Sequence, residues 1–227
     1  MNSFPPRKKR VMNKHHLFSK KNITFVSVGI FLSCLFFVWT FIVRKDVLHQ
    51  FDFNMTVHLQ DSIPIRLDPY FSYLSLFGSV EIIAPILFVI LLLRRKIWGI
   101  FFSFFLFGFA HVVEIIGKAF LYQPPPPFMF HRYALGFLFP SSYVQPGSSY
   151  PSGHSLRITF LAVICTYCIL KIKRFPLIFK ILCIAVVFII TFLMLVSRVS
   201  LGEHWTTDVI GGSMLGTSFG LLSLIFL

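Results

Sequence analysis

The stretch Ser197-Arg-Val-Ser-Leu-Gly-Glu-His-Trp-Thr-Thr-Asp208 is polar, although it lies between two long apolar runs. Near the hydrocarbon core of a membrane each charged group costs about 2.5 to 3.5 kcal/mol, so Arg198, His204 and Asp208 need a functional reason. If a helix begins near His204, Asp208 lies on the same face four residues later, where its carboxylate can hold one imidazole nitrogen and leave the other free to react. Arg198 adds a planar, bidentate donor for an oxyanion such as phosphate.

The composition is that of an integral membrane protein. Of the 227 residues, 56% are hydrophobic and 30 are phenylalanine, and the mean hydropathy is +0.79. These values exclude an ordinary soluble domain. The formal charge of +13 could indicate a nucleic-acid partner. However, the basic residues lie between the apolar runs rather than on one face of a soluble fold, so we expect no nucleic acid.

Six apolar runs are long enough to cross a bilayer, which predicts an all-α, six-transmembrane helix bundle. All of them belong to one membrane domain, residues 23–227, with spans at about 23–43, 70–93, 97–120, 155–170, 175–196 and 205–227. Pro85 is the expected site of a kink in the second span. The segment 44–69 is a mixed loop with room for a short amphipathic segment along the membrane surface. In the last span Gly212, Gly216 and Gly220 recur every four residues, a spacing that lets helices pack closely within the bundle.

The distribution of positive charge predicts the topology. Residues 1–22 form a basic tail, and together with the turns at 94–96 and 171–180 they hold 14 of the 21 lysines and arginines, with no acidic residue among them. By the positive-inside rule this side is cytoplasmic. The N-terminus is then cytoplasmic, and the loop 121–154 and the turn 198–204 lie on the extracytoplasmic side of what we take to be the cell membrane.

Five polar residues from different spans are thereby predicted to meet at that extracytoplasmic face: Lys118, His154, Arg198, His204 and Asp208. Pro151-Ser-Gly-His154 begins the fourth span, where free amides and the helix dipole favour an anion. This set suits phosphoryl transfer: the cations hold the phosphate oxygens, one histidine attacks phosphorus and the other protonates the departing alcohol. A zinc site from His154, His204 and Asp208 is the competing chemistry, but an anion site already accounts for the surrounding cations.

The third span carries His111, Glu114 and Lys118 on one helix face. Two interpretations are open for His111 and Glu114: a polar seam that holds helices together, or a direct part in the site. Lys118, nearest the helix end, has the better case for function.

These motifs resemble those of the type 2 phosphatidic acid phosphatases, the membrane branch of a superfamily that includes vanadium haloperoxidases. Two signatures are complete, Pro-Ser-Gly-His at 151–154 and Ser-Arg-x5-His-x3-Asp at 197–208, within a matching region of about 118–212. The resemblance implies that His204 is the nucleophile that forms a phosphohistidine, Asp208 its orienting partner and His154 the general acid. It also implies that no metal or other cofactor is needed and that phosphate is bound by Lys118, Ser152, the Gly153 amide and Arg198.

The first signature of the family, Lys-x6-Arg-Pro, is broken. Counting from Lys118 puts Pro125 in place of the arginine, followed by the expected Pro126. We hypothesise that Arg132, in the same loop, supplies the missing charge. Arg157, one turn after His154, is a second candidate that could equally be a packing or snorkelling side chain.

The resulting hypothesis is an integral membrane hydrolase that acts on a lipid phosphate or diphosphate, with membrane lipids as its partners. One alternative is a phosphotransferase that passes the phosphate to an acceptor other than water. The other is a membrane protein that binds lipid phosphate with impaired or no catalysis, which the Pro125 departure favours. Intact His154, His204 and Asp208 argue against an inert protein, because such a protein needs neither a nucleophile nor an acid.

Overall fold

The computed structural model describes residues 20–142 and 148–227, so nearly all of the predicted basic tail lies outside the described residues. This part of the chain is all α and contains no strand. Its helices are α1 (Lys20–Arg44), α2 (His49–Ser62), α3 (Asp68–Leu76), α4 (Val80–Leu93), α5 (Ile97–Phe120), α6 (Gly153–Lys171), α7 (Leu177–Ser200) and α8 (Thr206–Ser223). Five are long and apolar enough to span a membrane, and α3 with α4 forms a sixth span if the bent pair counts as one. The predicted all-α membrane bundle is therefore confirmed.

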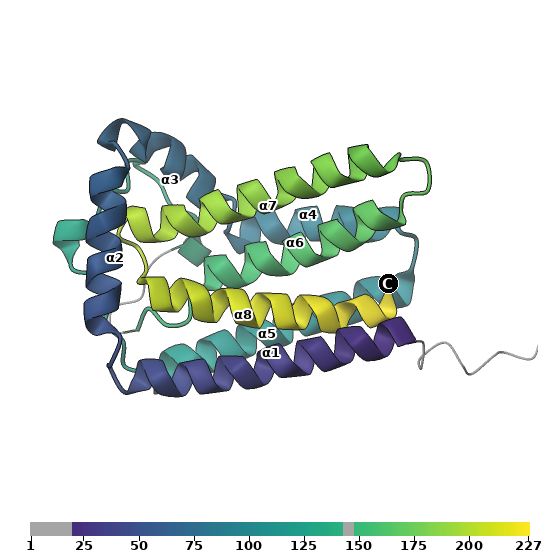
Figure 1. Ribbon diagram of the computed structural model, residues 1–227, viewed down its shortest axis with the longest axis horizontal. Helices are drawn as coiled ribbons and strands as arrows, with labels where there is room; N and C mark the ends of the chain where they lie inside the picture. Colours follow the sequence, from purple (N-terminus) through teal and green to yellow (C-terminus); the bar gives the residue numbers. More distant parts are fainter. Residues whose placement is uncertain (1–19, 143–147) are drawn as a thin grey trace, which may run out of the picture.

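The long helices run side by side, and α2 lies across one end of the bundle (Figure 1). The turn that joins α7 to α8, the end of α5 and the start of α6 lie at this α2 end. The start of α1, the chain end after α8 and the α6–α7 turn lie at the opposite end. Helix α8 packs between α1 and α6. Because α6 and α8 both begin at the α2 end, that end carries two neighbouring helix N-termini.

The second span is broken rather than continuous. Residues 65–76 and 80–93 make an angle of 53° across the break, whereas Pro85, the expected kink, lies inside α4. At the break is Gly78, where a Cβ would come within 1.9 Å of Met194 Cε and 2.8 Å of His154 Cδ2. The chain therefore breaks at Gly78, where close packing against Met194 and His154 leaves no room for a side chain, and not at Pro85.

The regularly spaced glycines of α8 pack against α6, as the sequence predicted. A Cβ on Gly212 would lie 2.2 Å from the Ser152 carbonyl oxygen, and one on Gly216 would lie 2.1 Å from the Leu156 carbonyl oxygen. Both obstructing atoms belong to the backbone and cannot turn away. These glycines therefore allow α6 and α8 to approach closely, which brings their N-termini together.

Gly216→Ala is expected to destabilise the fold by about 1 to 3 kcal/mol, because the added methyl group has no space against the α6 backbone. The measurement is the thermal unfolding midpoint of the detergent-purified protein. Gly108→Ala is the matched control, since nothing lies within 4 Å of a Cβ at that position of α5. It is expected to leave the midpoint unchanged or slightly higher, as alanine favours helix over glycine. Equal midpoints for the two variants would contradict this account of the packing.

Candidate functional site

A small polar pocket lies where α5, α6 and the α7–α8 turn meet. It is lined by Glu114, Lys118, Ser141, Ser142, Ser148, Ser149, Gly153, His154, Arg157 and His204. The structure thus brings together four of the predicted site residues, Lys118, Gly153, His154 and His204, from segments far apart in the sequence. Its free volume is about 10 Å³, the space of about one water molecule. A phosphate group can therefore enter only if lining side chains move.

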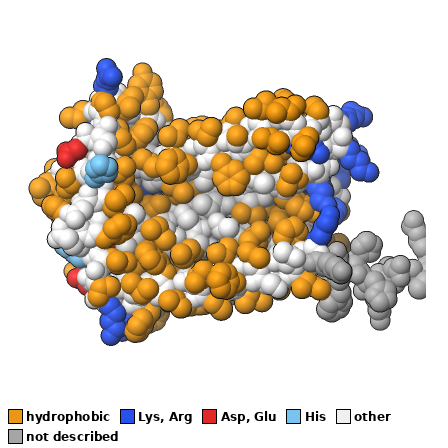
Figure 2. Space-filling view, in the orientation of Figure 1, with side chains coloured by type: hydrophobic (Ala, Val, Ile, Leu, Met, Phe, Trp, Pro, Cys, Tyr) orange, Lys and Arg blue, Asp and Glu red, His pale blue; other side chains and the backbone are white. Residues whose placement is uncertain are grey.

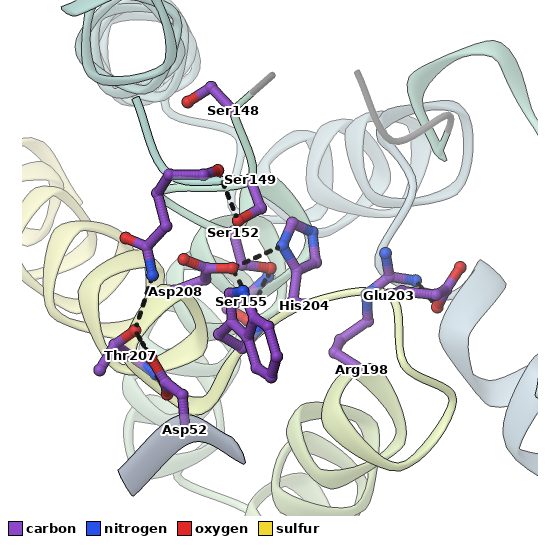
Figure 3. Close-up of polar contacts among 12 residues, drawn as sticks. Asp52, Ser148, Ser149, Ser152, Ser155, Arg198, Glu203, His204, Thr207 and Asp208 are labelled. Atoms are coloured by element: carbon purple, nitrogen blue, oxygen red, sulfur yellow. Dashed lines mark hydrogen bonds and ion pairs between the residues drawn. The ribbon is translucent and has the colours of Figure 1, made fainter. Parts of the chain in front are cut away.

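His204 lies in the tight turn between α7 and α8. The turn is made by Gly202, whose φ of 69° favours glycine, and the His204 amide donates to the Arg198 carbonyl at 3.1 Å. Figure 3 shows the imidazole turned toward Asp208, with 3.4 Å between Nδ1 and Oδ2. With Nδ1 directed at the carboxylate, Nε2 is left as the free nitrogen.

The pairing of His204 with Asp208 arises differently from the sequence expectation. Helix α8 begins at Thr206, so His204 precedes the helix instead of sharing a face with Asp208. The Asp208 carboxylate also accepts a 2.9 Å hydrogen bond from the Trp205 amide, which is the capping of a helix N-terminus. The carboxylate is thus fixed by the helix cap and reaches back to the histidine.

The electrostatic surroundings keep His204 neutral. Burial lowers its pKa well below the ordinary value of 6.5, and the positive charges of Arg198 and Lys118 lower it further. Only a neutral imidazole has a lone pair with which to attack an electrophile. The lowered pKa favours the neutral imidazole, which is the form that can act as a nucleophile.

Helix α8 receives a second cap from α2. The Asp52 carboxylate accepts the Thr207 amide at 2.9 Å and the Thr207 hydroxyl at 2.6 Å, as the dashed contact in Figure 3 shows. The Asp208 carbonyl in turn accepts the Ser152 amide at 3.0 Å. These bonds tie the Ser-Arg-x5-His-x3-Asp segment to α2 and to the Pro-Ser-Gly-His segment. Nothing in the sequence of residues 44–69 had pointed to Asp52.

Arg198 is a buried cation with unused donors. Its side chain is fully buried, and Nη1 contacts the Glu203 carboxylate and the Ser75 hydroxyl. Within the described residues Nε and Nη2 have no hydrogen-bond partner. Buried donors are costly when unpaired, so these two nitrogens are candidates for donating to an anion, although Arg198 is not among the residues that line the pocket. Glu203, which the sequence analysis had not singled out, holds the guanidinium in place (Figure 3).

Glu114 is both a seam residue and part of the pocket. Its carboxylate accepts from Lys118 Nζ at 2.7 Å and lies 2.8 Å from His111 Nδ1. A Cβ on Gly153 would lie 2.1 Å from Glu114 Oε1. Glycine at the start of α6 therefore lets the Glu114 carboxylate pack there and hold Lys118 beside the pocket.

His154 is held by Arg157 and Ser142. Arg157 Nη2 lies 3.2 Å from His154 Nδ1, and Arg157 Nε donates to the Gly78 carbonyl at 2.6 Å. Because a guanidinium can only donate, Nδ1 is the accepting nitrogen and Nε2 carries the proton. Nε2 lies 3.1 Å from the hydroxyl of Ser142, another lining residue that the sequence had not indicated.

The structure does not bring Arg132 to the pocket. Its Nε donates to Asp68 Oδ2 at 2.9 Å, and Nη1 and Nη2 donate to the Gln60 and Ile63 carbonyls at 2.9 and 3.1 Å. Every guanidinium nitrogen is thus engaged with the segment around α2. On this geometry Arg132 does not reach the pocket, so the hypothesis that it replaces the missing arginine finds no support here, and the arginine that does line the pocket is Arg157.

The zinc alternative finds no ligand set in residues 20–142 and 148–227. No three His, Cys, Asp or Glu side chains there are arranged so that they could hold a metal ion. Of the three residues considered for zinc, His204 and Asp208 form the pair described above, while His154 is bonded to Ser142 and Arg157.

Comparison with known proteins agrees with the fold. The chain is similar in structure to a transmembrane PAP2-type phosphatidylglycerolphosphate phosphatase from Bacillus subtilis, with 22% identity and a TM-score of 0.68 over 87% of this chain and 93% of that one. It is also similar to Aquifex aeolicus LpxE, with 23% identity and a TM-score of 0.56 over 76% and 93% of the two chains. No curated protein sequence matches it. The sequence profile of the PAP2 superfamily matches residues 96–227, more than half of the sequence, and the chain belongs to this superfamily.

Proposed function

We propose that this protein is a lipid phosphatase that hydrolyses a phosphomonoester or diphosphate of a membrane lipid through a phosphohistidine on His204, without a metal. One observation carries the proposal: a histidine, held by a buried carboxylate, faces the same pocket as a second histidine and a set of cations. The cations are Lys118, Arg157 and, behind the turn, Arg198. Structural likeness to two bacterial membrane proteins, one of them a phosphatidylglycerolphosphate phosphatase, is consistent with this class of substrate.

The reaction has two steps. His204 Nε2 attacks phosphorus, the bond from phosphorus to the lipid oxygen breaks, and that oxygen takes the proton from His154 Nε2. Water then attacks the phosphohistidine, gives its proton to His154, and frees phosphate and His204. Asp208 holds the Nδ1 proton throughout and stabilises the positive charge that develops on the imidazole.

Phosphate binding requires the side chains of the pocket to rearrange. Arg198 offers Nε and Nη2, and Lys118 lies beside Glu114. The helix dipole and the Gly153 amide at the start of α6, with Ser152 as its cap, favour an anion there. When phosphate enters, Arg157 turns from His154 to the phosphate. His154 Nδ1 is then free to be protonated, so that the imidazole can act as an acid at Nε2.

The site is proposed to face the extracytoplasmic side. The basic segments 94–96 and 171–180 are at the end of the bundle opposite the pocket, together with the start of α1. Positively charged flanks are retained on the cytoplasmic side. A lipid substrate would then be drawn from the outer leaflet of the cell membrane.

The proposal is tested by phosphate release from the detergent-purified protein. The panel contains phosphatidic acid, phosphatidylglycerol phosphate and a polyprenyl diphosphate, each with and without EDTA. Release that persists in EDTA supports the metal-independent reaction, and the preferred lipid identifies the substrate. Transfer of the phosphate to an added alcohol rather than to water would indicate a phosphotransferase. No release from any lipid by folded protein would leave a lipid-phosphate-binding protein.

The pH dependence should reflect the lowered pKa of His204. We expect the acid limb of kcat/KM to have its midpoint below 6.5, since the imidazole stays neutral until the pH falls to its own lowered pKa. Lys118→Met removes one of the charges that lower this pKa, so it should move the midpoint upward as well as weaken binding. The profile is measured with a substrate whose own phosphate ionisation has been titrated separately. A midpoint that does not move in Lys118→Met would contradict this assignment of the limb.

A further inference from the structure

A second, larger cavity lies at the end of the bundle opposite His204. It has a volume of about 750 Å³, and four basic side chains from three regions of the chain line it: Lys21 at the start of α1, Arg94 and Lys96 between α4 and α5, and Lys171 at the end of α6. All eight acidic residues of the chain lie in segments 46–81, 114 and 203–208, away from this end. Figure 2 shows the Lys and Arg side chains gathered there. The cavity is therefore a concentration of positive charge without a carboxylate side chain to balance it.

The basic groups are only partly satisfied by the protein. Lys96 donates to the main-chain oxygen of Leu227, and Lys171 lies 5.1 Å from the centre of the Tyr167 ring. Arg94 Nε is shielded from solvent and has no hydrogen-bond partner within the described residues. An anion with several oxygens would supply the missing acceptor and offset the mutual repulsion of the cations.

An apolar groove adjoins the cavity. The groove has a volume of about 300 Å³ between α1, α6, α7 and α8, and it shares Phe25, Tyr167, Leu170 and Leu224 with the basic cavity. Its remaining lining is mostly aliphatic and threonine side chains of the membrane spans, such as Val163 and Leu221. A cluster of cations at one end of the bundle thus lies next to an apolar groove between the membrane spans. A charged headgroup with an apolar chain, as in a phospholipid, matches this arrangement of polarity.

We propose that the basic cavity and its groove bind an anionic phospholipid of the leaflet on this side of the membrane, at a site separate from the catalytic pocket. The phosphate group pairs with Arg94, Lys171 and Lys21, and one acyl chain lies along Tyr167 and Leu170 into the groove. Basic pockets between membrane helices are suited to anionic headgroups. The chain's own N-terminal segment is a poor occupant, because residues 7–14 carry five lysines and arginines and no acid.

The test compares two double variants of equal charge. Arg94→Gln with Lys171→Gln removes two cations from the cavity, whereas Arg95→Gln with Lys173→Gln removes two from the same end without touching its lining. Binding of dioleoylphosphatidylglycerol, a phosphodiester, is measured by native mass spectrometry and by the rise in thermal midpoint in detergent. We expect the cavity variant to lose about 10- to 30-fold in affinity and the control to lose little. Phosphate release by both variants should remain unchanged, which separates this site from the catalytic one.

Binding of other ligands tests whether the site recognises a whole anionic lipid or only an anion. Phosphatidylcholine with the same chains, soluble glycerophosphoglycerol and inorganic phosphate should bind at least 10-fold more weakly than the anionic lipid. Equal binding of the soluble headgroup would show an anion site only, and equal losses in the two double variants would show attraction to general surface charge. If removal of residues 1–19 alone raised lipid affinity 10-fold or more, the tail would be the occupant. If the double variant does not fold, the single variants are compared instead: Arg94→Gln with Arg95→Gln, and Lys171→Gln with Lys173→Gln.

Discussion

His204→Ala is expected to abolish phosphate release, lowering kcat/KM by about 10⁴-fold or more, since His204 is the nucleophile of the proposed reaction. The variant should still fold. Within the described residues the imidazole of His204 makes one long hydrogen bond, 3.4 Å to Asp208. The turn itself is held by the backbone amide of residue 204 and by Gly202, which the substitution leaves in place. Release is measured by inorganic phosphate assay against the preferred lipid, with the thermal midpoint as the check on folding.

Asp208→Asn tests whether His204 acts together with Asp208, as the proposed mechanism requires. Asparagine keeps an oxygen for the Trp205 amide, so the α8 cap survives, but it removes the charge that stabilises His204 during attack. We expect a smaller loss than for His204→Ala. The double variant should be no worse than His204→Ala alone, because the two residues act as a unit. Losses that multiply in the double variant, or measurable trapping of phosphate on protein that lacks His204, would contradict His204 as the nucleophile.

Sequence patterns predicted the all-α membrane bundle well because the length and hydropathy of an apolar run are local properties. The apolar runs correspond to the long helices, and the glycine spacing of α8 correctly indicated close packing. The position of the break in the second span was not predictable in this way. Pro85 is a strong local signal, whereas Gly78 matters because Met194 and His154 pack against it from other helices.

The contact between His204 and Asp208 was predicted for a reason that proved incomplete. Four-residue spacing was read as one helix face, but α8 starts two residues after His204, and the pair depends on the capping role of Asp208. Asp52 lies 155 residues away in sequence from Thr207, which it caps. No rule based on residue spacing applies over such a separation, so the role of the Asp52 carboxylate is visible only in the folded structure.

Of the two candidate arginines, Arg132 and Arg157, helical spacing would have identified the one that lines the pocket better than position in the same loop did. Arg132 was favoured because it shares a loop with Pro125, yet its guanidinium is engaged with Asp68 and the Gln60 and Ile63 carbonyls. Arg157 follows His154 by three residues at the start of a helix, which places both on one face. Two residues that are close in an irregular loop can point their side chains in unrelated directions. Two residues three positions apart on a helix point their side chains to the same side.

Arg157→Gln is expected to lower kcat/KM by about 10² to 10³-fold and to weaken competitive inhibition by inorganic phosphate, because the pocket loses the guanidinium nearest His154. Arg157→Lys should recover part of the loss, since it keeps the charge but not the planar fork. Arg132→Ala is the matched control: it removes the ion pair with Asp68, so it should lower the thermal midpoint without changing phosphate inhibition. If Arg132→Ala instead weakened phosphate inhibition and Arg157→Gln did not, the missing cation of the Lys-x6-Arg-Pro motif would be supplied by Arg132 after rearrangement of its loop. A wild-type inhibition constant in both variants would mean that Lys118 and Arg198 suffice and that the change to Pro125 needs no replacement.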